Sequence, residues 1–111
     1  MALVNEKCGK IPSGTPPLSD NRKSELTIEI PHWLLMENSI SREWVCKDFL
    51  QAMSFVNKIA ELAEQENHHP DIGISYNKVH IELSTHKIGG LSINDFIMAA
   101  KIDQISDSSQ C

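Results

Sequence analysis

The strongest constraint on the fold is a run of apolar residues spaced three and four positions apart, from residue 49 to residue 63. This spacing places apolar side chains on one face of an α-helix. Asp48 stands at the expected N-cap, with Gln51 three residues later as in a capping box. Pro70 disfavours helical geometry at His69, so the predicted helix ends between residues 66 and 68. The stripe consists of Phe49, Ala52, Met53, Val56, Ile59, Ala60 and Ala63, widened by Phe55 and Leu62.

The segments on both sides of this helix alternate between apolar and polar residues, as β-strands do. Residues 32–37 and 39–46 are two short strand candidates, and the turn-favouring residues 38–39 between them predict a hairpin. After the helix, residues 71–84 alternate in the same way, and residues 77–78 predict a second hairpin. The sequence therefore predicts four strands.

Two other segments complete the predicted fold. Residues 24–30 fit a helix and a strand equally well, and Pro31 ends either element. A last helix is predicted after Ser92, a good N-cap, with Asp95 three residues later. Strands interrupted by long helices indicate an α+β fold, in which helices pack on one face of a four-stranded antiparallel sheet.

The length of 111 residues fits one domain, because either half alone would bury too small a core. A composition of 41% hydrophobic and 23% charged residues is that of a globular protein. Residues 1–20 are rich in proline and lack periodicity, which predicts a mobile or draped tail. We therefore expect a proline-rich tail over residues 1–20 and a domain over residues 21–106.

Charge and cysteine content narrow the classes of function. A formal net charge of -5 argues against direct binding of nucleic acid. The cysteines, Cys8, Cys46 and Cys111, are odd in number and show no CxxC spacing, so we expect neither a disulfide framework nor a zinc motif. This usage suits a reducing compartment. No apolar run reaches the length of a signal peptide or a membrane span, so the prediction is a cytoplasmic protein without membrane association.

Three of the five histidines gather around one predicted strand: His68, His69 and His86. An unperturbed imidazole titrates at about pH 6.5, close enough to neutrality to donate or accept a proton readily. The antiparallel path returns His86 toward the end of the long helix, where the other two lie. Glu64 stands four residues before His68, so its carboxylate is placed to orient that imidazole. Convergence of the three would make an acid/base site.

Plainer interpretations remain for these residues. Adjacent histidines before a proline are often a polar helix exit, and Asp95 needs no catalytic role as the third residue of a capped helix. Three histidines can hold zinc, but neighbouring residues diverge, and no HxH or HExxH pattern is present. His32 and His80 are expected to be structural or exposed.

The pattern around the histidines resembles that of the pterin-4a-carbinolamine dehydratases. The signature of that family is an acidic residue, two adjacent histidines and a proline, an aromatic residue, a Thr-His pair, a Gly-Leu-Thr/Ser turn and an aspartate. The resemblance covers roughly residues 24–103. The matching residues are Glu64, His68, His69, Pro70, Tyr76, Val79, Thr85, His86, Gly89, Gly90, Leu91, Ser92, Asp95 and Phe96, with weaker similarity at Trp33, Arg42 and residues 47–56.

The resemblance implies a specific reaction. Members of the family remove water from 4a-hydroxytetrahydropterin to give quinonoid dihydropterin, which recycles the pterin cofactor of aromatic amino acid hydroxylases. It implies no metal and no cofactor, and pterin as the substrate. His68 and His86 are then expected to be the proton-transfer pair, with His69 positioning the pterin. Ile72 departs from the pattern, because the family often has an aromatic residue there.

The resemblance also implies supporting residues and partners. Glu64 and Asp95 are expected to orient imidazoles or shape the pocket, and backbone groups near Ser84 and Thr85 to read the flat pterin ring. Members commonly form homodimers or homotetramers, and the wide apolar face of the long helix is compatible with that. In animals they also act as dimerisation cofactors of a homeodomain transcription factor. The alternative function is therefore a non-enzymatic binding module.

Overall fold

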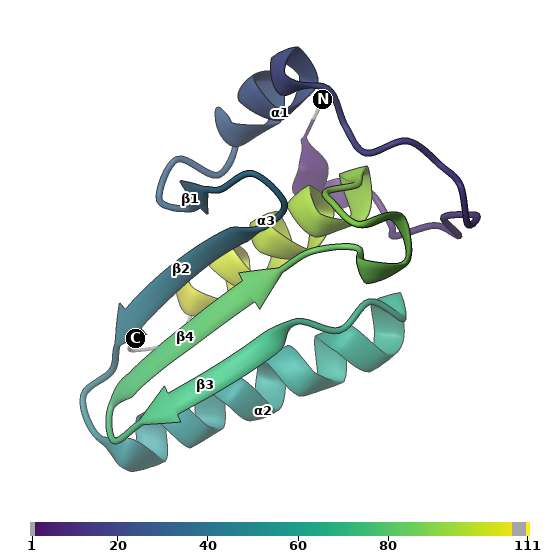
Figure 1. Ribbon diagram of the computed structural model, residues 1–111. Helices are drawn as coiled ribbons and strands as arrows, with labels where there is room; N and C mark the ends of the chain where they lie inside the picture. Colours follow the sequence, from purple (N-terminus) through teal and green to yellow (C-terminus); the bar gives the residue numbers. More distant parts are fainter. Residues whose placement is uncertain (1, 108–110) are drawn as a thin grey trace.

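Four antiparallel strands form one sheet in the computed structural model, which describes residues 2–107 and residue 111 (Figure 1). The strands are β1 (Leu34–Leu35), β2 (Ile40–Val45), β3 (Asp71–Ser75) and β4 (Lys78–Leu83). Their order across the sheet is β1-β2-β4-β3, so both predicted hairpins are present and the second one turns at residues 76–77. Edge strand β3 pairs with β4 alone among the described residues.

Two long helices lie side by side against one face of this sheet (Figure 1). They are α2 (Phe49–Glu66) and α3 (Ile93–Asp107). A shorter helix, α1 (Asp20–Thr27), precedes the first strand, and two 3-10 turns are η1 (Leu3–Asn5) and η2 (His86–Ile88). The predicted α+β class is thus confirmed.

Both ends of α2 follow from local chemistry. The Asp48 carboxylate accepts the backbone N–H of Gln51 at 2.9 Å, which satisfies one of the free amides of the first turn. Asn67 has a φ of 53°, a left-handed conformation that ends the helix after Glu66. The predicted cap and the predicted end are both confirmed.

The core lies between the sheet and the two long helices. Val79, Ile81 and Leu83 point inward from β4 and are fully buried, whereas His80 between them is exposed on the outer face. Trp44 of β2 is buried as well, and its ring meets the ring of Phe55 on α2 edge-on at 5.0 Å. The inward alternation of the strands and the apolar stripe of α2 therefore share one core.

The N-terminal segment is packed on the domain. Leu3 of η1 is 1% exposed, and its backbone N–H donates to Glu29 at 2.8 Å. Further along, the backbone N–H of Leu18 donates to the carbonyl of Leu91 at 2.9 Å. A Cβ placed on Gly90 would come within 2.9 Å of the Pro17 side chain, so the segment crosses this turn closely. The N-terminal segment thus lies along α3, with η1 beside the later turns of this helix and residues 17–18 beside the turn that precedes it.

Cys46, directly after β2, forms a disulfide with Cys111. The predicted absence of a disulfide is therefore wrong. The two residues are 65 positions apart, and only the folded chain brings them together. Disulfides are rare in the cytosol, so this bond does not fit the reducing compartment expected from the cysteine content. Cys8 is free. Within the described residues, no helix is both long enough and apolar enough to span a bilayer.

Candidate functional site

A cavity of about 420 Å³ opens where the end of α2 meets the start of α3. Four parts of the chain line it: residues 8–11 of the N-terminal segment, residues 66–68 at the end of α2, Thr85 and Lys87 between β4 and α3, and Asn94 in the first turn of α3. This volume lies in the range of small-molecule sites. The cavity therefore suits a ligand of the size of one or two fused rings with a substituent.

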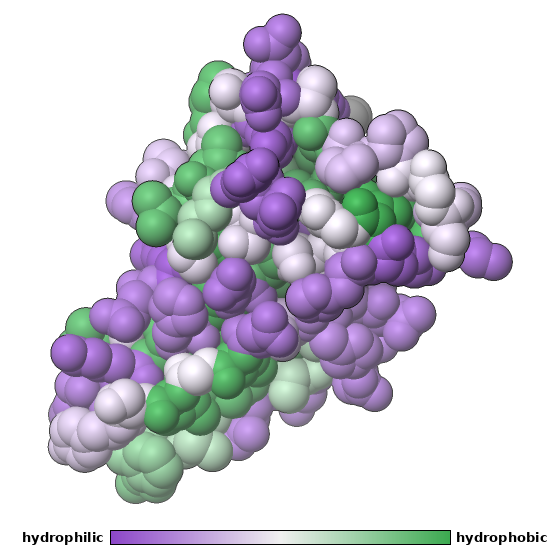
Figure 2. Space-filling model, viewed as in Figure 1, coloured by the Kyte–Doolittle hydropathy of each residue, from purple (hydrophilic) through white to green (hydrophobic). Residues whose placement is uncertain are grey.

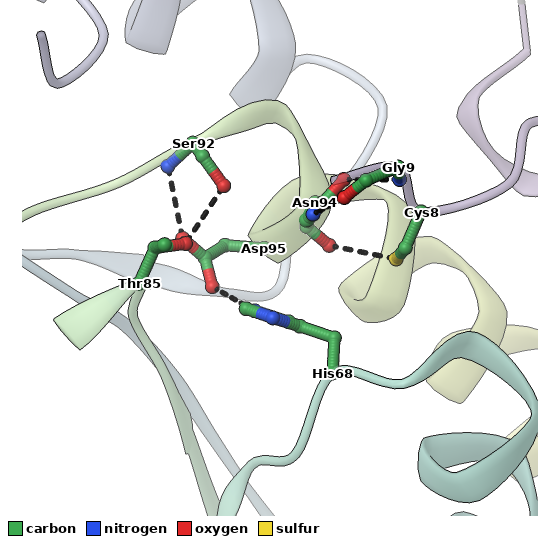
Figure 3. A network of polar contacts seen from close by, with 7 residues as sticks. All are labelled: Cys8, Gly9, His68, Thr85, Ser92, Asn94 and Asp95. Carbon is green, nitrogen blue, oxygen red and sulfur yellow. Dashed lines mark hydrogen bonds and ion pairs between the residues drawn. The ribbon is translucent and has the colours of Figure 1, made fainter. Parts of the chain in front are cut away.

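His68 and Asp95 meet at the wall of this cavity (Figure 3). The two atoms, Nε2 of His68 and Oδ1 of Asp95, are 2.6 Å apart. Asp95 is completely buried, while the side chain of His68 is 13% exposed. The same carboxylate accepts the backbone N–H of Ser92 at 3.0 Å through Oδ2, as the capping box predicts. Asp95 thus caps α3 and holds a histidine at the same time.

The hydrogen bonds around Asp95 fix the donor of each pair. Oδ2 of Asp95 also accepts the hydroxyl of Thr85 at 2.9 Å. A hydroxyl has one proton, so Thr85 must accept from the hydroxyl of Ser92, 2.7 Å away. The carboxylate then accepts from three donors, with Nε2–H of His68 as the third. Nδ1 of His68 makes no hydrogen bond with the described residues, so this nitrogen can take or give a proton.

His69 and Glu64 form a separate, exposed pair. Oε2 of Glu64 lies within hydrogen-bond distance of Nε2 of His69, with the two side chains 78% and 56% exposed. The predicted contact between Glu64 and His68 is therefore wrong. The left-handed residue Asn67 ends the helix before His68, so the spacing of four residues no longer stacks the two side chains.

Of the other predicted site residues, Thr85 lines the cavity and bonds Asp95, whereas His86 and Ser84 are its neighbours in sequence and do not join the His68–Asp95 contact. His86 begins η2 and is exposed, next to the lining residue Thr85. The backbone N–H of Thr85 donates to the carbonyl of Gly90 at 2.9 Å. The side-chain hydroxyl of Thr85 is the group that bonds Asp95. Ser84, the residue before it, is half-buried. The described residues contain no group of three or more side chains arranged to hold a metal ion.

The structure adds residues that the sequence did not single out. Asn94 is buried and bonds Gly9 twice: its Oδ1 accepts the Gly9 N–H at 3.0 Å, and its Nδ2 donates to the Gly9 carbonyl at 2.7 Å (Figure 3). Glu66 accepts the backbone N–H of Cys8 at 2.8 Å. These contacts join residues 58 to 85 positions apart, and no local pattern reveals them.

Two ionisable groups in this region are shifted. Burial raises the pKa of the Cys8 thiol to about 12, and the neighbouring Glu66 carboxylate adds to the effect. Burial alone would raise the pKa of Glu66 as well, but the N–H of Cys8 and the ammonium of Lys101, 3.2 Å away, hold it below its ordinary value. The carboxylate of Glu66 is therefore ionised at neutral pH and already has its partners.

The fold and the site together define the class: a small α+β protein in which a buried carboxylate holds a histidine against an open polar cavity. The sequence profile of the family described as pterin 4 alpha carbinolamine dehydratase matches residues 16–105. The chain belongs to this family. The match begins after residues 8–11, so these lining residues lie outside it.

Similar proteins agree with this assignment. A protein of Nitrosomonas eutropha, provisionally named a pterin-4-alpha-carbinolamine dehydratase, is 43% identical over 93% of this chain and 92% of its own length. A protein of Methylococcus capsulatus with the same provisional name is 39% identical over 95% of this chain and 94% of its own.

Two solved structures share the fold. A transcriptional coactivator/pterin dehydratase from Brucella melitensis superposes with a TM-score of 0.76 at 31% identity, over 80% of this chain and 97% of its own. A pterin dehydratase-like protein described as a RuBisCO assembly factor in the alpha-carboxysome has a TM-score of 0.57 at 20% identity, over 69% of this chain and 89% of its own. The second likeness concerns the fold alone.

Proposed function

We propose that this protein is a 4a-hydroxytetrahydropterin dehydratase, which turns the adduct left by aromatic amino acid hydroxylases into quinonoid dihydropterin. Membership of the family supports the reaction. The observation that carries the proposal is the placement of His68, fixed by the buried Asp95 at the wall of the cavity. A fixed imidazole with one free nitrogen is suited to general acid or base catalysis.

The dehydration needs one proton delivered and one removed. The bond between C4a and its hydroxyl oxygen breaks, and the hydroxyl accepts a proton and leaves as water. The ring nitrogen N5 loses its proton, so the overall change is the loss of water, without an oxidant, a reductant or a metal. Because Asp95 occupies Nε2 of His68, the proton passes through Nδ1. Asp95 favours this tautomer and stabilises the imidazolium when it forms.

The other histidines are assigned supporting or complementary roles. His86, on η2 beside Thr85, is proposed as the second proton-transfer group, and His69 as a group that positions the pterin. Glu64 orients His69 through their contact. Backbone groups near Ser84 and the side chain of Thr85 are proposed to bind the polar edge of the ring.

The test is the rate of dehydration of 4a-hydroxytetrahydropterin, followed by absorbance, for the purified protein with and without a chelator. His68→Ala should lower the rate by roughly 10² to 10⁴, the range for a well-placed acid or base, and His86→Ala should also lower it. His80→Ala is the matched control, since His80 is an exposed histidine on the outer face of the sheet. Chelation should leave the rate unchanged. A normal rate in the His68→Ala/His86→Ala double variant would overturn the site assignment.

A binding module is the second candidate function. The Brucella melitensis structure is described as a transcriptional coactivator as well as a pterin dehydratase. In this chain, apolar side chains are exposed over β3 and the start of α2 (Figure 2), among them Ile72, Ile74, Phe49 and Leu50. A surface of this kind can bind a partner without the histidines. A folded protein with no dehydratase activity would favour this function.

We also propose a homodimer or homotetramer. Strand β3 is an edge of the sheet, because among the described residues it pairs with β4 alone, and its exposed residues Ile72 and Ile74 add apolar area to this edge. Light scattering coupled to size exclusion should give a mass of two or four chains of 12.4 kDa. A charged residue at Ile74 should lower that mass while the histidine site stays intact, and a monomeric mass for the unchanged protein would refute the proposal.

A further inference from the structure

The N-terminal segment supplies one wall of the cavity. Residues 8–11, here called the strap, lie opposite His68, Thr85 and Lys87. Glu66 accepts the backbone N–H of Cys8 on the strap. Asn94 holds Gly9 by two hydrogen bonds (Figure 3). Leu3 before it is buried, and Leu18 after it is bonded to Leu91. A segment anchored on both sides and at its middle forms a fixed part of the site.

The charges that line the cavity do not balance. Its lining residues include one acidic residue, Glu66, and two lysines, Lys10 on the strap and Lys87 on η2. Glu66 is paired with Lys101 and with the N–H of Cys8. Lys10 and Lys87 form no ion pair within the described part of the chain. The cavity lining therefore includes two lysines without an ion-pair partner in a chain whose formal net charge is -5, and the one carboxylate behind its wall, Asp95, is already occupied by three hydrogen-bond donors.

The pterin ring does not account for these charges. The ring of a 4a-hydroxytetrahydropterin is uncharged at neutral pH, and its polar edge is matched by hydrogen-bonding groups such as hydroxyls. The part of a pterin that varies is the substituent on C6. An anionic group there is the chemistry that two ammonium groups attract, and each exposed contact of this kind contributes modestly.

We propose that Lys10 and Lys87 recognise an anionic group, a phosphate ester or a carboxylate, on the C6 substituent of the pterin. This inference rests on the proposed function, because it concerns the same cavity. The strap brings one of the two lysines and lies outside the part of the chain that matches the family profile. The His68–Asp95 contact handles the proton, and the lysines select the substituent.

The test uses three stable, fluorescent pterins that differ at C6: 6-hydroxymethylpterin, its phosphate ester and pterin-6-carboxylate. Their affinities for the full chain are measured by fluorescence titration. At low salt the two anionic pterins should bind roughly tenfold more tightly than the neutral one, about three- to fivefold for each lysine. The preference should fall as ionic strength rises. A preference for only one of the two anions identifies the group.

The variants Lys10→Ala and Lys87→Ala should each reduce the ratio of anionic to neutral affinity, and the double variant should bring it close to one. Lys7→Ala is the matched control, because Lys7 is exposed, near the strap, and outside the cavity lining. It should leave all three affinities unchanged.

Two outcomes overturn the inference in distinguishable ways. Equal binding of the neutral and anionic pterins, or an equal loss of preference in Lys7→Ala, refutes the role of the lysines and leaves the proposed function in place. If none of the three pterins binds, both the role of the lysines and the proposed function are refuted.

Discussion

Asp95 serves two elements at once. One of its carboxylate oxygens caps α3 through the N–H of Ser92, and the other holds His68. From the sequence alone, the place of Asp95 in a predicted capping box was enough to explain why an aspartate stands there. Its second role depends on His68 lying 27 positions away in sequence, and the structure alone shows that contact.

The change Asp95→Asn should separate these roles. An amide cannot accept from all three donors, so either His68 or the donors at Ser92 and Thr85 lose their partner. We expect the dehydration rate to fall by about 10² or more and its pH profile to move, because the favoured tautomer of His68 is lost. Unfolding in urea should show a loss of about 1–3 kcal/mol. Asp71→Asn, at an exposed carboxylate of β3, should change neither, and an unaltered pH profile in Asp95→Asn would contradict this role.

The thiol of Cys8 should react slowly with alkylating reagents. Its pKa of about 12, raised by burial and by Glu66, leaves very little thiolate at pH 8. Alkylation by iodoacetamide, followed by mass spectrometry, should be far slower in the folded protein than in urea. Cys8 is the cysteine outside the disulfide, so one adduct is expected. Glu66→Gln should speed the reaction, because it removes the negative charge beside the thiol. If the folded protein were alkylated at Cys8 as fast as the protein in urea, the buried environment described for this thiol would be wrong.

At the scale of elements, helix ends decide what the site contains. The end of α2 and the start of α3 were predictable, because Asp48, Pro70 and Ser92 mark them by well-defined chemistry. The first helix could not be told from a strand, since the apolar residues Leu26 and Ile30 fit the spacing of a helix and the alternation of a strand equally well. The N-cap Ser19, which accepts the N–H of Arg22 at 3.2 Å, is the signal that would have decided it.

The strap and the Glu64–His69 pair show where sequence reasoning fails. The rule that residues four apart meet holds only while a helix continues, and Asn67 ends it. The strap has no period, and its anchors Glu66 and Asn94 are remote in sequence. The histidines and Asp95 were therefore visible from the sequence, whereas the wall that encloses them was not.

Acid should loosen the strap. The pKa of Glu66 is depressed in the folded protein, because the N–H of Cys8 and Lys101 outweigh the effect of burial. A depressed pKa contributes stability that is present above the ordinary value of 4.5 and lost as the pH falls through the folded value. The protection factors of the Cys8 and Gly9 amides, which correct for the slower intrinsic exchange in acid, should fall as the pH is lowered across this window. Glu66→Gln should already exchange faster at neutral pH, and Glu61→Gln, an exposed residue of the same helix, should not.

At the scale of the whole molecule, the disulfide ties the chain end back to the end of β2. The bond between Cys46 and Cys111 closes a loop with a sequence separation of 65 residues. A constraint on so long a loop reduces the freedom of the unfolded chain by about 4 kcal/mol in the chain-entropy estimate. Two isolated cysteines without a motif gave no indication of the pairing.

Reduction should therefore lower the free energy of unfolding, by up to about 4 kcal/mol, in urea titrations with and without a phosphine reductant. Cys111→Ser should match the reduced protein and should not respond to the reductant. Cys8→Ser should behave like the unchanged protein, since Cys8 takes no part in the bond. Identical midpoints with and without reductant would show that the bond does not stabilise the fold.

The two anchors of the strap sit beside the two members of the proton-handling pair: Glu66 is two residues from His68, and Asn94 is next to Asp95. The same two helix ends therefore hold both the strap and the His68–Asp95 pair. Because Glu66 and Asn94 bond the backbone of residues 8 and 9, a chimera with the first fifteen residues of a relative should keep these hydrogen bonds as long as positions 66 and 94 remain Glu and Asn.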